Sequence, residues 1–362
     1  MKPRVLYPFA RALLFSLDPE VAHDLTLATV QRAHALGVAR WVAKRVAPLP
    51  VSVMGLNFPN PVGLAAGLDK TAAHIDALGN LGFGFIEAGT VTPRPQTGNA
   101  KPRIFRLIDS HALINRMGFN NEGVDQFIGN VRRQRAFREG GGILGLNIGT
   151  NADTPIERAL EDYRTCLRNV YDDADYVAVN VSSPNTKELR SLQSARQLAA
   201  LVAGLAEERK RLEDRHRKRV PLAVKIAPDL ADESIPEIAD SLVEHSIDAV
   251  IATNTTVARE MVKGHKHADE TGGLSGRPLT ERATQVVHLL ARHLQGALPI
   301  IGVGGIMSGA DAVEKIEAGA SLVQLYTGFI YAGPQLIAEC VEAIRGSRCA
   351  VSSPPGPTRR RA

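Results

Sequence analysis

The sequence is poor in cysteine and contains no long apolar run. Its three cysteines, Cys166, Cys340 and Cys349, lie far apart and include no CxxC pair, so neither a disulfide framework nor a zinc cluster is expected. No stretch reaches the roughly 18 apolar residues that a membrane-spanning helix needs. Arg11 interrupts the first apolar run, and no small-residue cleavage site follows, which argues against a signal peptide. We therefore expect a globular protein of a reducing, cytosolic compartment.

Positive charge is concentrated at the two ends of the chain. Residues 1–46 carry a net charge of +4, and the arginines at 359–361 add +3 to a Pro/Ser-rich tail. Because the whole chain has a net charge of +5, the body between them is close to neutral, at −2. This distribution argues against a nucleic-acid groove across the main domain.

Short apolar runs alternate with longer helix-like segments from residue 61 onward. The expected strands span residues 61–67, 85–90, 143–149, 176–182, 222–227, 249–254, 299–304 and 322–328. Segments 155–171, 192–215, 233–245 and 280–294 carry apolar residues three and four apart, as amphipathic helices do. Eight strands with intervening helices predict an α/β protein with a (β/α)8 TIM-barrel fold.

Two short helices are expected before the barrel. Leu6, Phe9, Leu13 and Leu17 recur at near-helical spacing, and the segment 18–20 is a capping sequence for a second helix that runs to about residue 36. With their basic flanks and Trp41, these helices resemble an interfacial membrane anchor. A small helical cap packed on the barrel explains the same pattern, so both interpretations stay open.

Polar residues gather at the carboxyl ends of the expected strands, where barrels carry their chemistry. In chain order they are Lys70, Thr90, Asn147, Asn180, Ser183, Asn185, Lys225, Thr253, Asn254, Gly304, Gly305, Tyr326 and Thr327. Pro184 ends the strand at 176–182 because it cannot donate to a sheet ladder, which leaves Ser183 at a strand mouth. Taken alone, this segment could equally be a capped turn.

Lys225 lies inside a run that is otherwise fit for complete burial. A lone buried lysine costs several kcal/mol unless an anion or strong acceptors pair with it. Glu87 is the main candidate for an ion pair with it, but a bound anionic ring system is the favoured partner.

Two glycine-rich segments, 271–276 and 302–306, suit close approach of the backbone to a phosphate. Neither has the GxxxxGK[ST] or GxGxxG spacing, so a Walker loop and a dinucleotide fingerprint are excluded. The second precedes a helix expected near Ser308, and late βα loops of a barrel commonly hold phosphate. A plain turn role for each remains open.

The segment 115–121 is too polar for a core and too apolar for a free loop, which indicates a lid or substrate wall. His265 and His267 are separated by one lysine in an expected loop, and we interpret them as surface residues and expect no metal site.

These motifs resemble the FMN-dependent dihydroorotate dehydrogenases, specifically the membrane-associated class 2 enzymes that reduce quinones. The resemblance extends from the amino-terminal helices to about residue 345. Its most specific parts are the segments 65–70, 115–121, 180–186, 272–278 and 301–306.

The resemblance implies a set of FMN-binding residues. They are Ala65, Ala66, Gly67, Leu68, Asp69, Thr90, Asn147, Asn180, Lys225, Thr253, Gly276, Gly305, Tyr326 and Thr327. Lys225 would stabilise the reduced, anionic flavin. Gly276, Gly305, Tyr326 and Thr327 would hold the phosphate.

The resemblance also implies a site for dihydroorotate and orotate. Its residues are Lys70, Asn115, Arg116, Met117, Gly118, Phe119, Asn180, Asn185, Asn254 and Thr255. Ser183 would act as the base while N5 of FMN takes the hydride, in de novo pyrimidine biosynthesis. The soluble class 1 relatives have cysteine where this chain has Ser183, which favours the quinone-using class.

The quinone would then reach the flavin edge between the two terminal helices, beside His23, Arg106 and Tyr326. The implied organisation is an amino-terminal extension at 1–46, an FMN-binding barrel at 47–345 and a disordered basic tail at 346–362. The resemblance further implies a peripheral protein on the cytoplasmic face of the cell membrane, with no nucleic-acid partner.

Two other enzyme classes stay open. A flavin barrel that reduces uracil within RNA would share the fold and the phosphate site, although the near-neutral body and apolar terminal helices count against it. A phosphate-binding lyase or isomerase without flavin would also fit a barrel with glycine-rich late loops.

Overall fold

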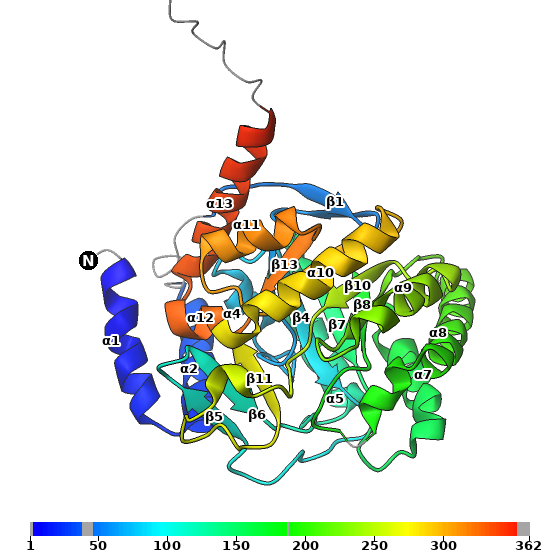
Figure 1. The fold of residues 1–362 in the computed structure, drawn as a ribbon, viewed down its shortest axis with the longest axis horizontal. Coiled ribbons are helices and arrows are strands. Elements are labelled where there is room, and N and C mark those ends of the chain that lie inside the picture. The colour runs from blue at the N-terminus through cyan, green and yellow to red at the C-terminus, as the bar shows by residue number, and fades with distance from the viewer. Residues whose placement is uncertain (1–2, 38–45, 187, 353–362) are drawn as a thin grey trace, which may run out of the picture.

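The computed structural model describes residues 3–37, 46–186 and 188–352. The strands of its central sheet are β3 (Val62–Leu64), β4 (Phe85–Val91), β7 (Ile143–Ile148), β8 (Tyr176–Asn180), β9 (Leu222–Ile226), β10 (Ala249–Ala252), β12 (Ile300–Val303) and β13 (Leu322–Leu325). They form a closed parallel barrel in the order β10-β12-β13-β3-β4-β7-β8-β9 (Figure 1). All eight predicted strands and the TIM-barrel fold are confirmed.

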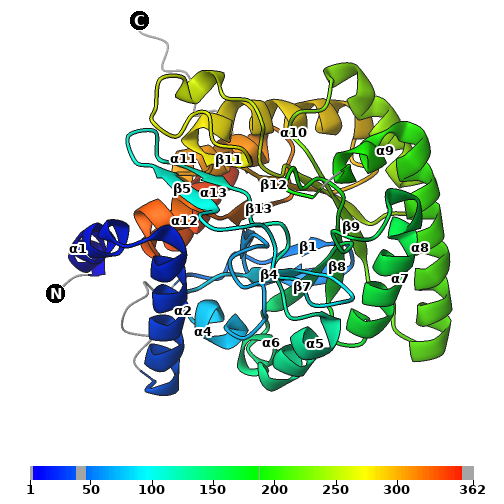
Figure 2. The same ribbon diagram turned by 90° about the horizontal axis from the view of Figure 1, so that it is seen from below.

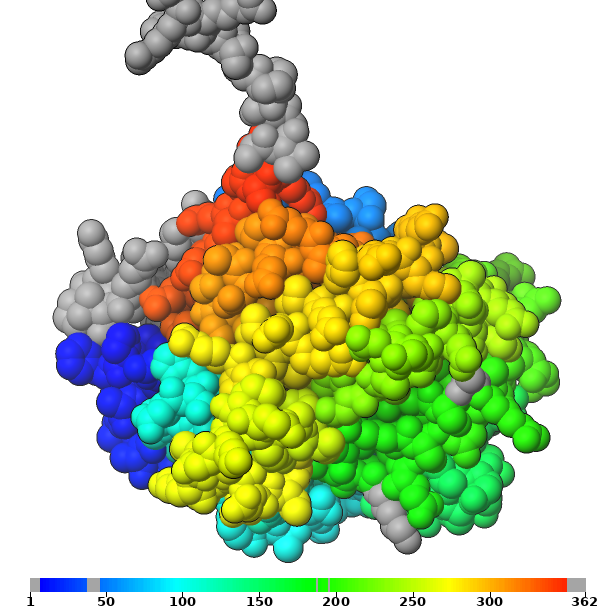
Figure 3. Space-filling view, viewed as in Figure 1, coloured from blue at the N-terminus to red at the C-terminus, as the bar shows by residue number. Residues whose placement is uncertain are grey.

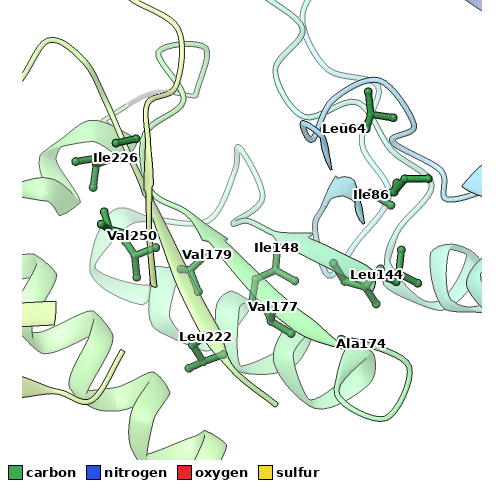
Figure 4. Close-up of a cluster of buried hydrophobic side chains, with 14 of the residues drawn as sticks. Leu64, Ile86, Leu144, Ile148, Ala174, Val177, Val179, Leu222, Ile226 and Val250 are labelled. Carbon is green, nitrogen blue, oxygen red and sulfur yellow. The ribbon is translucent and has the colours of Figure 1, made fainter. Parts of the chain in front are cut away.

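Helices surround this barrel (Figure 1). They are α4 (Ile75–Gly79), α5 (Val124–Arg133), α6 (Ala136–Glu139), α7 (Ala159–Val170), α8 (Ala195–His216), α9 (Ile235–Glu244), α10 (Thr280–Leu294), α11 (Gly309–Glu317), α12 (Thr327–Ala332) and α13 (Gln335–Ser352). Between strands and helices lies a continuous apolar core, to which Leu64, Leu144, Val177 and Val250 belong (Figure 4). Burial on both faces explains why the strands read as unbroken apolar runs.

The inside of the barrel is filled at its amino end and polar at its carboxyl end. Phe85 and Tyr176 are fully buried there, and Gly63 and Gly145 make room for them, because a Cβ at either glycine would collide with a ring. A hairpin of β1 (Val51–Val53) and β2 (Leu56–Phe58) covers this end, and Phe58 meets Phe85 edge to face at 5.2 Å. Side chains alternate along a strand, so the next inward positions carry polar groups.

A small antiparallel sheet stands beside the barrel mouth. It consists of β5 (Ile104–Leu107), β6 (Ala112–Asn115) and β11 (Gly273–Gly276), in the order β11-β6-β5. Most of the segment 271–276, whose glycines suit close approach to a phosphate, is strand β11, and its last residue, Gly276, lines the cavity described below. Pairing with β6 takes up backbone groups that a free loop would offer to a phosphate.

The two terminal helices form as predicted, as α1 (Pro3–Ser16) and α2 (Pro19–Ala35). The carboxylate of Asp18 caps α2 by accepting from the backbone of Glu20 and Val21. Figure 2 shows both helices at one edge of the barrel, and Figure 3 shows α1 on the outside of the molecule. Among the described residues, no helix is both long and apolar enough to span a bilayer.

Ion pairs and hydrogen bonds attach these helices to the small sheet. The Glu20 carboxylate receives both Nε (3.2 Å) and Nη2 (2.7 Å) of Arg103, and Lys101 lies 3.2 Å away. Arg106 donates to the carbonyls of Leu14, Phe15 and Leu17 at the end of α1.

The carboxyl-terminal boundary differs from the expectation. The tail was expected from residue 346, but helix α13 continues to Ser352, packed beside α11. Residues 353–362, with the arginines at 359–361, lie outside the described residues, as do Trp41 and its basic neighbours.

Replacement of Glu20 by glutamine should loosen α2. The nearly buried Arg103 would lose a charged partner, which costs about 2 kcal/mol. Burial raises the pKa of Glu20, but hydrogen bonds from Arg103 and Lys101 outweigh it and lower the pKa on balance. The stabilisation is therefore present above the unfolded carboxyl's pKa and lost as the pH falls through the lowered value.

Hydrogen exchange of the α2 amides measures this effect. Glu161→Gln is the matched control, because its ion pair with Arg158 is more than 60% exposed on both sides and should contribute little. Equal α2 exchange in the Glu20 variant and the wild type would contradict the expectation.

Candidate active site

A cavity opens at the carboxyl ends of the barrel strands. Most predicted site residues line it: Ala65, Ala66, Gly67, Lys70, Thr90, Asn115, Met117, Gly118, Phe119, Asn180, Ser183, Asn185, Lys225, Thr253, Asn254, Thr255, Gly276, Gly305, Tyr326 and Thr327. They come from all parts of the chain between residues 65 and 327, so the fold assembles the site.

Two lysines dominate the charge of this cavity. Among the described residues that line it there is no aspartate, glutamate, histidine or cysteine. Lys70 and Lys225 therefore face the cavity without a carboxylate in its wall. An anionic ligand would offset the cost of holding two cations in a partly desolvated space.

Lys225 projects from the middle of β9, one inward position beyond Ala223. It is 5% exposed, and burial lowers its pKa, an effect that the Glu87 carboxylate opposes. Glu87 itself accepts hydrogen bonds from other side chains, and within the described chain Lys225 has neither a hydrogen bond nor an ion pair. The geometry thus favours an external anion as its partner.

Lys70 follows the turn after β3 and is half-buried. Burial, and then the nearby Arg103 guanidinium, lower its pKa to about 8. Asp69 does not line the cavity; its carboxylate accepts from the backbone of Ala73 and His74 and so shapes the turn that carries Lys70. Leu68 lies beside Asp69 on a second cavity, under α2.

Ser183 lies just beyond β8, as the proline at 184 predicted. Its hydroxyl accepts from the backbone N–H of Asn185 at 3.2 Å, and its side chain is 5% exposed. Arg190 fixes this segment, because it donates to the carbonyls of Ser182 and Thr255. The hydrogen bonds of Arg190 therefore hold the loop that carries Ser183 at the edge of the cavity.

The segment 115–121 forms a wall, as predicted. In the cavity wall, Asn185 donates to Asn115 at 3.3 Å, and the side chain of Asn121 donates to the hydroxyl of Thr92 at the other end of the segment. Arg116 is the exception, because it points out of the cavity into an ion pair with Glu270 at 2.6 Å. It also lies over the ring of Phe105, 4.6 Å from its centre.

Glycines at positive φ shape the opposite end of the cavity. Gly276 has φ +97° and Gly305 has φ +75°, values that favour glycine at both positions. Thr327 begins α12 and donates its hydroxyl to Ser275 at 2.8 Å. Burial raises the pKa of Tyr326 to about 12, so its hydroxyl stays protonated.

The structure does not bring His23, Arg106 and Tyr326 to one place. Tyr326 lines the main cavity, whereas His23 lines the second cavity, under α2, together with Lys70. Burial, and then Lys70, lower the pKa of His23 to about 4, so the ring is neutral near pH 7. Arg106 is engaged by the end of α1 and, with its guanidinium 4.7 Å from the ring centre, by Phe15.

Several site residues were missed from the sequence. Ser275, Leu279, Val303, Ile306, Gln324 and Gly328 also line the cavity. Gln324 had a readable signal, because it is the one polar residue of a four-residue apolar strand. Asn147, by contrast, is fully buried behind the cavity rather than in its wall.

Comparison with known proteins gives one consistent family. The profile of the family described as dihydroorotate dehydrogenase matches residues 48–346. "Dihydroorotate dehydrogenase (quinone)" of Ralstonia nicotianae is 61% identical over 339 residues, 94% of this chain and 98% of that protein. The protein of the same name from Burkholderia ambifaria is 61% identical over 345 residues, 95% and 99% of the two chains.

A solved structure is also similar. The crystal structure of the Eimeria tenella enzyme in complex with ferulenol superimposes with a TM-score of 0.84 at 39% identity, covering 92% of this chain and 93% of that chain.

Replacement of Lys225 by methionine should stabilise the ligand-free protein by about 1 to 3 kcal/mol, because it removes a buried cation without a partner. The matched control is Lys315→Met. Lys315 is fully buried too, but its ammonium donates to the carbonyl of Thr280 and the hydroxyl of Thr284, so this change should destabilise. Thermal melting of both variants checks the opposite signs; a lower melting temperature for Lys225→Met would contradict the account.

Proposed function

This chain belongs to the dihydroorotate dehydrogenase family, in its quinone-dependent class, and on that premise we propose that its cavity binds FMN and oxidises (S)-dihydroorotate to orotate in de novo pyrimidine biosynthesis. The observation that carries the proposal is a strand-mouth cavity with two lysines, no acidic wall residue and a pinned serine. The two lysines suit an anionic cofactor and an anionic substrate, and the serine hydroxyl beside them is a weak base.

The residues present fit FMN. Lys225 is a buried cation that an anionic ligand would neutralise. Gln324 also lines the cavity, and its Oε1 is buried without a hydrogen-bond partner in the described chain. Ala65, Ala66 and Gly67 would lie along the ring, and Gly276, Gly305 and Thr327 would hold the phosphate. When bound, the flavin would supply the hydride acceptor.

The orotate-like substrate would lie at the other end of the cavity. Lys70 offers a cation to its carboxylate, and amides of Asn115, Asn185 and Asn254 can donate to and accept from its ring. Met117 and Phe119 would pack against it. Arg116, already paired with Glu270, would support this wall from outside.

Ser183 is the proposed base. Its Oγ takes the proton from the carbon next to a substrate carbonyl while its own hydroxyl proton passes to a positioned water or hydroxyl. A serine is a weak base, so Lys70 and the wall amides must stabilise the developing enolate.

The terminal helices are the proposed contact with the membrane and its quinone. Large apolar side chains are exposed along them, with Phe9 71% and Leu13 69% exposed and Val21 and Leu25 about half exposed. An apolar face of this kind suits peripheral binding to the cytoplasmic face of the cell membrane. Because His23, Arg106 and Tyr326 do not lie in one place, they would flank different parts of the quinone's path to the flavin.

One assay separates this function from the alternatives. Dihydroorotate oxidation is measured with a quinone, fumarate or NAD as the only acceptor, and turnover with the quinone alone is expected. A colourless protein that FMN cannot reconstitute would support a flavin-free lyase or isomerase. Binding of tRNA at physiological salt, without dihydroorotate oxidation, would support a flavin barrel that acts on RNA.

Ser183→Ala should keep FMN and lose at least about a hundredfold in kcat, because the base contributes a factor of this order. Ser183→Cys should retain part of the activity. Flavin absorbance per chain controls for damage to the site, and near-normal turnover in the alanine variant would eliminate the role of Ser183.

The pH profile of kcat/KM should report Lys70. Since its pKa is about 8 in the ligand-free site, the ammonium that attracts the substrate carboxylate is lost as the pH rises through that value. We expect kcat/KM for dihydroorotate to fall above pH 8, and Lys70→Arg to flatten the profile between pH 7 and pH 9. A wild-type profile that is flat over this range would contradict the assignment.

Replacement of both Phe9 and Leu13 by glutamate should abolish binding to phospholipid vesicles, because two charges would enter the apolar face of α1. Val243→Glu is the control, since Val243 is also exposed but lies on α9 of the barrel. Co-sedimentation with vesicles measures the difference. Unchanged sedimentation of the double variant would refute the assigned membrane face.

A further inference from the structure

A fully buried carboxylate lies inside the barrel, behind the wall of the active-site cavity. Glu87 projects inward from β4 and accepts three hydrogen bonds from three other strands. The donors are Nδ2 of Asn147 on β7 at 2.7 Å, the hydroxyl of Tyr176 on β8 at 3.0 Å, and Nε2 of Gln324 on β13 at 2.7 Å. All three donors are neutral, so Glu87 forms no ion pair with them.

The carboxylate determines which end of Asn147 faces it. Both oxygens of a carboxylate only accept, so the asparagine must present its NH2 group to Glu87. Its oxygen then faces the other way, where it accepts from the hydroxyl of Thr90 at 2.6 Å. That bond uses the single proton of the hydroxyl.

The same reasoning extends from Thr90 to the cavity wall. With its proton used, the oxygen of Thr90 can only accept, and it receives the NH2 group of Asn180 at 3.0 Å. The oxygen of Asn180 in turn accepts from Nδ2 of Asn254 at 3.3 Å. One directed chain of hydrogen bonds therefore runs from Glu87 on β4 to Asn254, beyond β10.

The outer members of this chain face the cavity, whereas Glu87 does not. Thr90, Asn180, Asn254 and Gln324 line the cavity, and Glu87 and Asn147 lie behind it. An asparagine amide that turns over exchanges its donor for its acceptor. The oxygen of Asn180 also accepts from the backbone N–H and the hydroxyl of Ser182, both at 3.3 Å. The face that Asn180 offers to the cavity is therefore set by Ser182 together with the chain that starts at Glu87, a residue outside the cavity wall.

The surroundings of Glu87 keep this polarity fixed. Burial, and then Glu87 itself, raise the pKa of Tyr176 well above its ordinary value, so the hydroxyl keeps its proton and donates. Glu87 also opposes the effect of burial on the pKa of Lys225.

We propose that Glu87 is a positioning residue, which fixes the amide orientations of Asn147 and Asn180 and thereby the hydrogen-bonding pattern offered to the flavin. The inference rests on the proposed function, because FMN is the ligand that would form hydrogen bonds with these amides. A merely structural role would make Glu87 important for folding but not for the bound flavin.

Glu87→Gln is the decisive variant, because it keeps the size of the side chain but adds a donor. Its NH2 group would oppose either the NH2 of Asn147 or a donor from Tyr176 or Gln324. We expect the purified holoenzyme to release FMN about tenfold faster, measured as flavin fluorescence after dilution, and to show a shifted visible absorption spectrum.

Asp76→Asn is the matched control. Asp76 is a buried carboxylate on α4 that accepts from the backbone of Arg135 and Phe137, away from the cavity. It should melt at a lower temperature but release FMN at the wild-type rate. If it released FMN as fast as Glu87→Gln does, the effect would be general destabilisation and the proposal would fail.

A second variant tests whether the direction of the hydrogen bonds matters. It also gives a result if Glu87→Gln alone does not fold. In Glu87→Gln combined with Asn147→Asp, the new glutamine donates to the new carboxylate, which still accepts from Thr90. This swap should restore folding, slow FMN release and the wild-type spectrum.

The proposal is overturned if Glu87→Gln keeps the wild-type release rate and spectrum, or if the swap is no better than the single variant. Measuring the wild-type holoenzyme in the same experiment distinguishes a failure of this proposal from a failure of the proposed function. Wild-type protein that holds no FMN would remove the proposed function, whereas tight wild-type binding with an unaffected Glu87 variant removes only the positioning role.

Discussion

The structure depends on the closure of eight parallel strands into a barrel whose side chains are buried on both faces. Inside such a barrel no polar group reaches bulk water from the middle of a strand, so each needs a partner from another strand or from a ligand. The amino end of the barrel is filled mainly by the rings of Phe85 and Tyr176, and the Tyr176 hydroxyl finds its partner in Glu87. The carboxyl end carries a layer of polar side chains.

Two charged residues in the barrel interior are stabilised in different ways. Glu87 is satisfied by the protein, through three neutral donors on three strands. Lys225 has no such partner in the described chain and faces the cavity. A fully satisfied polar group makes a site rigid, whereas an unsatisfied one at a cavity makes it receptive, and the proposed flavin pocket needs both.

The terminal helices carry the proposed membrane contact without altering the barrel. They are tied to the small sheet through Glu20, Arg103 and Arg106, and the sheet continues through β6 into the wall at 115–121. The proposed membrane face and the substrate wall are thus parts of one connected structure. The apolar side chains of Phe9 and Leu13 on α1 remain exposed.

The sequence by itself determined the repeating βα pattern, the two terminal helices and most of the cavity. Apolar runs that end in polar residues mark strand mouths, and a lysine within such a run has few partners, so Ser183 and Lys225 could be predicted. Only the tertiary structure decided where side chains with several possible partners point. Arg116 turned to Glu270, Arg106 to the end of α1, and Glu87 to three strands that lie far apart in the chain. Hydrogen-bond and ion-pair choices of this kind depend on which strands become neighbours, and local sequence carries no record of that.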